Sequence, residues 1–376
     1  MRNFAAFDQV LASGSNFLIG ILLVRAFGLF EYGRFALAWL FVEFLASLQG
    51  AAIIQPMLNI GPKQAEADRD LYDDAVLAQQ VIACMGFGLV AWASATLAGW
   101  LLSDPEFNRL ALPLGAVVMA YQLQSFFRRY FFARDRPITG LVNDALRFTI
   151  QIAATSALAF AWPGSTAAVG LWIVAAGCAV SALQGLIYFG RSRWNTAVLV
   201  DVSVRHWRFS KWLLPSALMY WMTSQGFLVM AGFVLGAATI GGLKAAWSIT
   251  GLVYILLLAL DNFAPVQAAR AVHVGGPIEL RRNIARLALL TGTLVVAAMA
   301  MINIDPGYLI HLLYGDRFDG VEQVEQLVRW VCAPIAVTAL NTVLAIWAAA
   351  IERTRIIFMS YAAATVFTVI AAYPLT

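Results

Sequence analysis

The chain has 376 residues, of which 61% are hydrophobic and only 12% are charged, and its mean hydropathy is +0.76. Charged residues make up roughly a quarter of an ordinary soluble protein, so this composition excludes a soluble enzyme or binding domain. The formal net charge of +4 comes from basic residues whose placement predicts membrane orientation, and it does not favour nucleic-acid binding.

Apolar runs bounded by charged residues, Pro or Gly recur along the whole chain. A helix needs about 20 such residues to cross ~30 Å of hydrocarbon, and eleven runs come close to this length. We therefore predict an all-α, multi-pass membrane protein, because helices satisfy their own backbone hydrogen bonds within lipid. The predicted spans are residues 8–24, 33–57, 76–101, 109–132, 138–161, 166–189, 211–235, 243–264, 283–304, 325–350 and 355–373.

A basic stretch at residues 191–211 divides these runs into two groups. It contains five of the 25 Lys and Arg residues. We interpret it as a cytoplasmic linker between an N-terminal six-helix bundle, residues 1–190, and a C-terminal bundle, residues 212–376. With a cytoplasmic N-terminus, 18 Lys and Arg residues lie on the inner side of the membrane and six on the outer side, in line with the positive-inside rule.

The residues that bind metals or act as nucleophiles are few and scattered. The three cysteines, Cys84, Cys178 and Cys332, lie in three different runs, and the three histidines lie in loops. A small buried hydrophobe is the usual role of such a cysteine. We therefore expect no metal, no cofactor and no catalytic site.

The first run carries a polar face. Gln9, Ser13, Asn16 and Gly20 are spaced at i, i+4, i+7 and i+11, so they share one side of a helix. This side should avoid lipid, either by packing against another helix or by lining a cavity. Asn16 is a candidate substrate-binding residue on the second interpretation.

A tight turn joins the first two runs. Gly28 and Gly33 can adopt the positive φ that a short turn between helices needs. Together with Phe27, Glu31 and Tyr32, they form a turn that resembles the Leu-Gly-x-x-Glu-Tyr-Gly-like turn of the polysaccharide translocases. These are the O-antigen and repeat-unit flippases of the multidrug/oligosaccharidyl-lipid/polysaccharide exporter superfamily.

The outer loop at 305–324 and the inner turn at 351–355 are also similar to this family, so the resemblance extends over essentially the whole chain. It implies two helical bundles that face each other across a central cavity and alternate its access between the two sides of the membrane. It also implies twelve spans. The second group of runs has five members where the first has six, so we expect the chain to lack its last helix.

Glu43 lies about ten residues into the second run, with no Lys or Arg three or four positions away. An ionised carboxylate at that depth costs several kcal/mol unless it is paired or hydrated. It is therefore protonated, paired across helices or exposed to water. We regard Glu43 as a candidate residue for coupling transport to a proton or cation.

The fourth and fifth runs carry basic residues at and within the membrane. Four arginines lie between residues 126 and 137, where they either signal topology and contact lipid headgroups or guide an anionic headgroup. Asp144, Arg147, Gln151 and Thr155 then follow at i, i+3, i+7 and i+11 on one face, with Asn143 beside them. Arg147 lies ~13 Å along the helix, well into the hydrocarbon. It either pairs locally with Asp144 or faces a cavity, and Asp144, Arg147 and Gln151 are candidate substrate-binding residues.

The second group of runs repeats the first. At an offset of 208 residues, Gly28 corresponds to Gly236, and Trp39 corresponds to Trp247. These positions fall at equivalent places in the order of runs, which predicts two units related by a parallel repeat. The further candidate substrate-binding residues of the seventh and eighth runs are Tyr220, Thr223 and Lys244, although Lys244 could instead reach the membrane interface.

The resemblance implies a flippase, not an enzyme, in the inner membrane of a bacterium. Its substrate would be a polyprenyl-pyrophosphate-linked oligosaccharide for a surface polysaccharide such as lipopolysaccharide or capsule, and its partners would be membrane lipids and other polysaccharide-assembly proteins. Hydroxyl and amide side chains suit a sugar, and fixed positive charge suits a pyrophosphate. Two alternatives remain open: a cation-coupled multidrug antiporter of the same superfamily, and a membrane polymerase or ligase acting on the same lipid-linked sugars.

Overall fold

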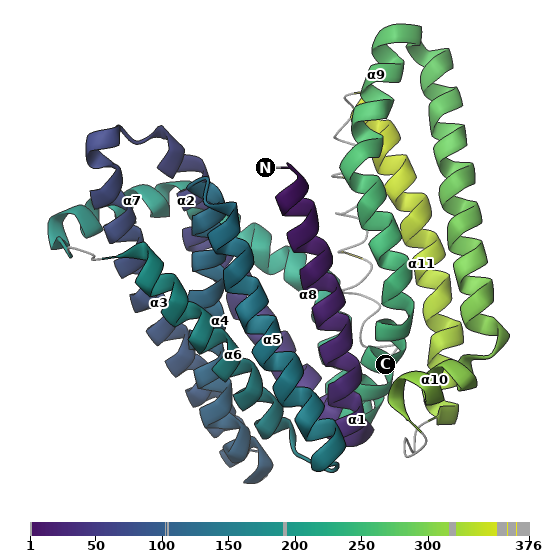
Figure 1. Cartoon of the computed structure of the whole chain (residues 1–376), viewed down its shortest axis with the longest axis horizontal. Coiled ribbons are helices and arrows are strands. Elements are labelled where there is room, and N and C mark those ends of the chain that lie inside the picture. The colour runs from purple at the N-terminus through teal and green to yellow at the C-terminus, as the bar shows by residue number, and fades with distance from the viewer. Residues whose placement is uncertain are drawn as a thin grey trace. The chain divides into compact units, whose positions relative to one another are not determined.

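The computed structural model describes residues 2–101, 103, 105–190, 194–315, 321–351, 359 and 366, and its regular elements are all helices (Figure 1). The chain divides into two compact units, Met1–Val229 and Met230–Thr376. This division falls later in the chain than the predicted linker, inside a helix. We describe each unit by itself.

The first unit consists of long helices joined by short turns. Two of its shorter elements, a π-helix and an α-helix, follow the first helix directly in the chain. Its elements are α1 (Arg2–Gln49), the π-helix η1 (Gly50–Ile54), α2 (Gln55–Ile60), the 3₁₀-helix η2 (Gly61–Lys63), α3 (Glu66–Leu101), α4 (Pro105–Ala133), α5 (Pro137–Ala161), α6 (Ala167–Phe189), α7 (Thr196–Ser210) and α8 (Leu213–Leu235), which crosses into the second unit.

The second unit contains α9 (Ala237–Ile304), α10 (Pro306–Tyr314) and α11 (Val321–Ala350). The two long helices share a hydrophobic core, in which Leu280 and Leu287 of α9 lie with Val343 and Ile346 of α11. Figure 1 shows α9 rising, turning and running back beside α11.

Two helices are too long to be single membrane spans. α1 has 48 residues and α9 has 68, which correspond to ~72 Å and ~100 Å of straight helix against ~30 Å of hydrocarbon. Each is broken at a glycine with positive φ, Gly28 (φ 72°, ψ 177°) and Gly276 (φ 60°, ψ −157°). Side-chain-bearing residues almost never adopt these angles, so each glycine permits a sharp reversal. α9 therefore contains two of the predicted runs, 243–264 and 283–304, and α1 contains the run 8–24 and the first part of the run 33–57.

Helices cover the first ten predicted spans. Among the described residues, six helices are long and apolar enough to cross a membrane, or seven if the bent helix α8 counts as one span. α5 is long enough but is not among them, since its polar stripe lowers its hydropathy. The prediction of eleven spans is thus supported in part, and the last predicted span, 355–373, lies outside the described residues except at 359 and 366.

The two glycines paired by the predicted repeat have the same backbone conformation. Gly28 has φ 72° and ψ 177°, and Gly236, which precedes α9, has φ 87° and ψ 171°. These angles are accessible almost only to glycine. The correspondence seen in sequence at an offset of 208 residues is therefore accompanied by the same local geometry.

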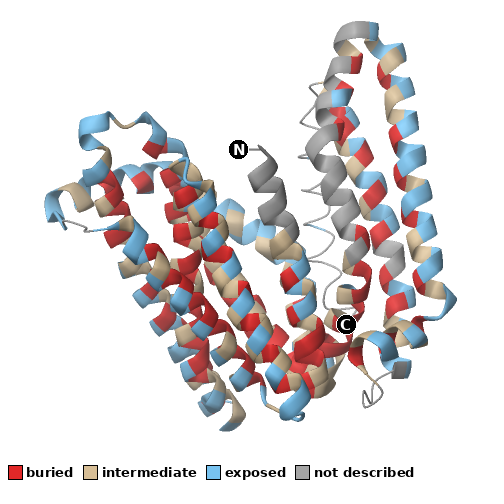
Figure 2. Ribbon diagram, viewed as in Figure 1, coloured by how far each residue is buried: buried red, intermediate tan, exposed pale blue. Residues whose placement is uncertain are grey.

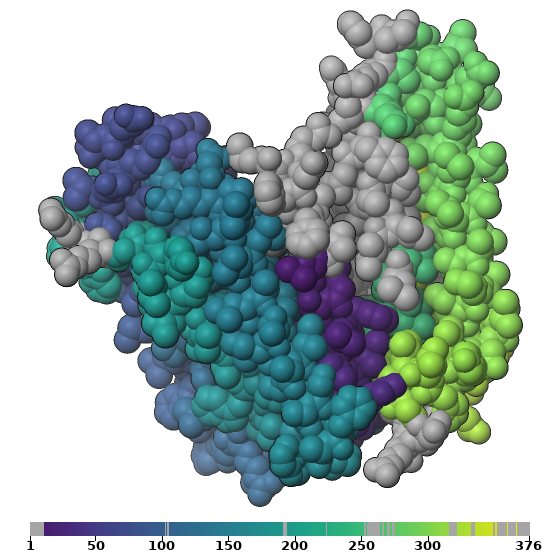
Figure 3. Space-filling view, in the orientation of Figure 1, coloured from purple at the N-terminus to yellow at the C-terminus, as the bar shows by residue number. Residues whose placement is uncertain are grey.

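The core of the first unit lies among α3, α4 and α6. Phe126, Phe127 and Phe131 of α4 are fully buried, and a Cβ on Gly185 of α6 would lie 2.3 Å from Phe127 Cγ. The absence of a side chain at Gly185 thus lets α4 and α6 approach closely. Figure 3 shows the first part of α1 beside α5, with which it packs.

The outer face of α3 is exposed and apolar, as a lipid-facing helix requires. Ile82, Met85 and Leu89 are each more than half exposed, and Figure 2 shows exposed positions recurring along this helix. Such a continuous apolar surface would be unusual on a protein surrounded by water.

Candidate functional site

The most polar region inside the first unit is a network that joins α4, α5 and α6. Gln124 Nε2 of α4 donates to Asn143 Oδ1 at 3.0 Å and to Asp144 Oδ1 at 2.8 Å. Arg147 Nη1 donates to Gln124 Oε1 at 3.2 Å. Arg128 Nε lies 2.8 Å from Asp144 Oδ2. One amide, Gln124, therefore connects the carboxylate with Arg147 through its two ends.

The ion pair of Asp144 is with Arg128, one helix away, and the local pair with Arg147 that the spacing also permitted does not form. Asp144 is 1% exposed, so its charge is balanced within the bundle by a residue of α4. Arg147 makes no ion pair among the described residues. Its guanidinium lies 4.1 Å from the ring centroid of Phe148 and 5.9 Å from that of Tyr121.

Arg147 is half-buried, and its Nε is buried without a hydrogen-bond partner in the described part of the chain. Cation–π contacts of this kind stabilise a partly desolvated guanidinium but do not neutralise its charge. An incompletely bonded Arg with a planar fork of donors is suited to bind a phosphate or carboxylate in two places at once.

The remainder of the predicted α5 stripe packs against α6. Asn143 Nδ2 donates to the Ser181 carbonyl and to Gln184 Oε1, both at 2.6 Å. Gln151 Nε2 donates to the Val174 carbonyl at 3.2 Å, and a Cβ on Gly177 would lie 2.8 Å from Gln151 Cγ. In this structure, these amides are buried, and they hold α5 and α6 together.

A chain of contacts through two aromatic rings connects Glu43 with Arg147. Trp39 Nε1 donates to Glu43 Oε1 at 3.0 Å, and Trp39 meets Tyr121 edge to face with centroids 5.3 Å apart. Tyr121 is one of the two rings beside Arg147. Glu43 is half-buried, and the rings of Trp39 and Tyr121 connect this predicted coupling residue with the guanidinium of Arg147.

The other predicted residues are not part of this network in the described structure. Asn16 is exposed on α1, and Tyr220 is 70% exposed on α8. The side chain of Thr223 lies outside the described residues. Lys244 belongs to the second unit, where its Nζ lies 5.4 Å from the ring centroid of Trp247.

A second set of buried amides lies where α1 meets the π-helix η1. Gln49 Nε2 donates to Gln80 Oε1 at 3.0 Å and to the Gln122 carbonyl at 2.9 Å. Both side-chain polar atoms of Gln122 are buried without a partner among the described residues. π-Helical turns often mark functional positions. These three glutamines, with Gln124 and Gln184, were missed in the sequence, although a polar residue inside an apolar run is a recognisable signal.

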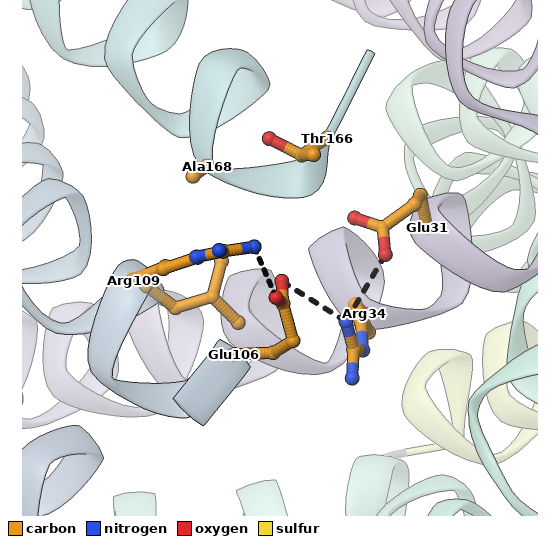
Figure 4. Close-up of a pocket in the computed structure, with 7 residues that line it drawn as sticks. Glu31, Arg34, Glu106, Arg109, Thr166 and Ala168 are labelled. Carbon is orange, nitrogen blue, oxygen red and sulfur yellow. Dashed lines mark hydrogen bonds and ion pairs between the residues drawn. The ribbon is translucent and has the colours of Figure 1, made fainter. Parts of the chain in front are cut away.

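The turn at Glu31 has a structural role. Figure 4 shows Glu31, Arg34 and Glu106 joined by ion pairs, with Arg34 Nη1 3.1 Å from Glu31 Oε1 and 3.4 Å from Glu106 Oε2, and Arg109 paired with Glu106. Glu31 also accepts a hydrogen bond from Ala167 N at 2.8 Å and thereby caps α6. The turn therefore ties α1 to α4 and α6. The cavity beside these residues holds only about 10 Å³, which is too small for a substrate.

Within the described residues, no group of three or more His, Cys, Asp and Glu side chains is placed to hold a metal ion. The side chains of the network supply charge and hydrogen-bonding groups, which can bind a polar solute.

Comparison with known proteins finds similarity at the level of structure. No model of a protein family matches the chain, and a search of curated protein sequences finds no match either. The chain is similar to an inward-facing multidrug resistance MATE family transporter of the MOP superfamily, with a TM-score of 0.62 and 15% identity over 92% of this chain and 81% of that one. It is also similar to the eukaryotic MATE transporter AtDTX14, with a TM-score of 0.56 and 16% identity over 93% and 82% of the two chains.

A third similar structure is a MOP superfamily transporter from Pyrococcus furiosus, described as having a binding pocket of reverse polarity that suggests a different function. The TM-score is 0.53, with 13% identity over 96% of this chain and 82% of that one. The chain is a multi-pass membrane protein that has, over most of its length, the fold of the MATE and MOP transporters.

Proposed function

We propose that this chain is a transporter that moves an anionic, lipid-linked oligosaccharide across a bacterial plasma membrane for surface-polysaccharide synthesis. The fold supports transport, since the solved structures that share it are named as transporters. The resemblance of the turn at Gly28 to that of the polysaccharide translocases supports the substrate class. We propose no enzymatic activity.

The proposal rests on the burial of Arg147 and on its lack of an ion pair among the described residues. Arg147 is half-buried at a depth where charge is costly, and among the described residues it makes no ion pair, because Asp144 is paired with Arg128. The network therefore has a positive charge available for a ligand. The Pyrococcus furiosus transporter is described as having a pocket of reverse polarity that suggests a different function, so pocket charge is a reasonable basis for distinguishing substrates within this fold.

The test is substitution of Arg147 in a strain that depends on this chain for its surface polysaccharide. Arg147→Ala should abolish the polysaccharide while the protein remains in the membrane, and Arg147→Lys should retain part of the activity, because Lys keeps the charge but loses the bidentate fork. Arg109→Ala is the matched control, since the Arg109 side chain is 70% exposed among the ion pairs of Figure 4. Normal polysaccharide with Arg147→Ala at normal expression would exclude Arg147 as the substrate site.

Glu43 favours one alternative, a cation-coupled multidrug antiporter. A half-buried carboxylate held by the Trp39 indole could bind a cation or a proton. Reconstituted protein loaded with a cationic dye distinguishes the two functions. Dye efflux that depends on Glu43 and is indifferent to Arg147→Ala would favour the antiporter.

A further inference from the structure

The predicted linker contains a helix, α7, which lies between the ends of α6 and α8. Asn195 precedes the first residue of the helix, and its side-chain oxygen accepts hydrogen bonds from Ala197 N at 3.0 Å and Val198 N at 3.3 Å. This is a standard N-cap, which fixes the start of the helix. Figure 1 shows α7 running crosswise to the long helices of the first unit.

One face of α7 is docked on the first unit. Val202, His206 and Ser210, spaced four residues apart, are its buried residues. His206 Nε2 lies 2.9 Å from Tyr72 Oη of α3, and Ser210 Oγ donates to the Ala52 carbonyl of η1 at 3.3 Å. These contacts fix the rotation of the helix about its axis.

A second face of α7 is apolar and exposed. Val200, Val204 and Trp207 are 57%, 45% and 62% exposed. Trp194 before the helix and Trp212 after it are also exposed, at 62% and 75%. Such a set of exposed apolar side chains is unusual on a helix surrounded by water.

The third face of α7 is charged. Asp201, Arg205 and Arg208 are exposed between the docked face and the apolar face, and Lys211 follows the helix. Three basic residues against one acidic residue leave a net positive charge, which complements an anionic surface. Around its axis, α7 therefore has one face docked on the first unit, one apolar face and one charged face.

We propose that α7 lies in the inner membrane–water interface and binds anionic lipid headgroups. Its apolar face would enter the boundary between headgroups and acyl chains, and Arg205, Arg208 and Lys211 would contact the phosphates. Connectivity supports a lipid surface as the occupant. α6 ends at Phe189 and α8 begins at Leu213, and because no span separates them, both ends lie on the same side of the membrane.

Side-chain chemistry supports the same occupant. Trp residues concentrate at membrane interfaces. Amphipathic helices that lie in this interface insert their apolar face by ~5–10 Å into the boundary between headgroups and acyl chains. Each basic residue near an anionic surface contributes about 1 kcal/mol, which corresponds to roughly a fivefold preference for anionic lipid. The proposal does not depend on which substrate the chain transports.

The test uses the full chain in lipid nanodiscs made from equimolar phosphatidylglycerol and phosphatidylcholine. Cys84, Cys178 and Cys332 are replaced by Ala, and a single cysteine carrying a bimane fluorophore is introduced by Val204→Cys or, as the matched control, by Asp201→Cys. Brominated lipids report contact with lipid, and iodide reports contact with water. We expect brominated lipid to quench the fluorophore at 204 and iodide to quench the one at 201.

The headgroup preference is tested with the fluorophore at 204. Brominated phosphatidylglycerol should quench it more strongly than brominated phosphatidylcholine, and Arg208→Gln with Lys211→Gln should reduce this preference severalfold, whereas Asp201→Asn should not. Iodide quenching at 204 equal to that at 201 would overturn the lipid contact and leave the face to a protein partner. Equal quenching by the two lipids would overturn the recognition of anionic headgroups.

Discussion

Removal of Arg128 should destabilise the first unit, because Asp144 would then keep a buried charge without this ion pair. Asp144 is 1% exposed, and its Oδ2 lies 2.8 Å from Arg128 Nε. Breaking a buried ion pair by removing one partner costs ~3–5 kcal/mol. Because the Arg128 side chain is 27% exposed, we expect Arg128→Met to lower the free energy of unfolding by about 3 kcal/mol, the lower end of this range.

A double-mutant cycle measures this interaction. Asp144→Asn removes the charge and keeps an oxygen for the hydrogen bond from Gln124, so Arg128→Met combined with Asp144→Asn should recover most of the loss. The readout is the apparent thermal unfolding midpoint in detergent. For a unit of about this size 1 kcal/mol corresponds to ~2–4 °C, so Arg128→Met alone should lower the midpoint by about 6–12 °C.

Arg109→Met provides the control, because Arg109 is exposed. Surface substitutions usually change the free energy of unfolding by no more than about 0.5 kcal/mol, so this variant should unfold within about 2 °C of the wild-type midpoint. The reasoning is wrong if the effects of Arg128→Met and Asp144→Asn simply add. If Asp144→Asn instead couples to Arg147→Met, the local pair on α5 is the correct one and Arg147 has no charge available for substrate.

Two further predictions concern the turn of α1 and the docking of α7. Gly28→Ala should lower the free energy of unfolding by at least about 1–3 kcal/mol, because φ 72° with ψ 177° is strained for any residue with a Cβ, although the space around Gly28 is open. The thermal unfolding midpoint measures this loss, and an unchanged midpoint would contradict the prediction. Burial, with a smaller effect of Arg205, lowers the pKa of His206 from 6.5 to about 4. The stabilisation by neutral His206 is therefore complete above pH 6.5 and is lost as the pH falls toward 4. Between pH 7.5 and 5.5, wild type should lose about 1 kcal/mol more stability than His206→Asn, and equal losses would refute this role.

The long elements of the fold were accessible from sequence because the length of an apolar run is a strong signal. The first ten predicted spans lie in helices, and the reversal at Gly28 was expected from its turn. The helix α7 was missed, since the basic residues of 191–211 indicated only a cytoplasmic linker between two bundles. Its period of four, visible in Val202, His206 and Ser210, becomes meaningful only when the surface that buries them is known.

The partner of Asp144 shows a different limit of sequence analysis. Spacing on one helix identifies Arg147, three residues away, as a candidate partner, and the sequence left this pair open. The actual partner, Arg128, is on the preceding helix, and its proximity depends on how α4 packs against α5. Periodicity reports which residues share a face, but it does not report which residue of another helix meets them.

This choice of partner determines the charge of the candidate site. If Asp144 were paired with Arg147, the two charges would cancel, and Arg128 would be one more arginine among those between residues 126 and 137. With Asp144 paired to Arg128, the positive charge that remains is that of Arg147, which lies beside Tyr121. The buried amides then have a positional role: Asn143 and Gln151 fix α5 against α6, and Gln124 holds Arg147 in place. The packing of three helices, and not the content of one stripe, therefore decides whether this site attracts an anion or is neutral.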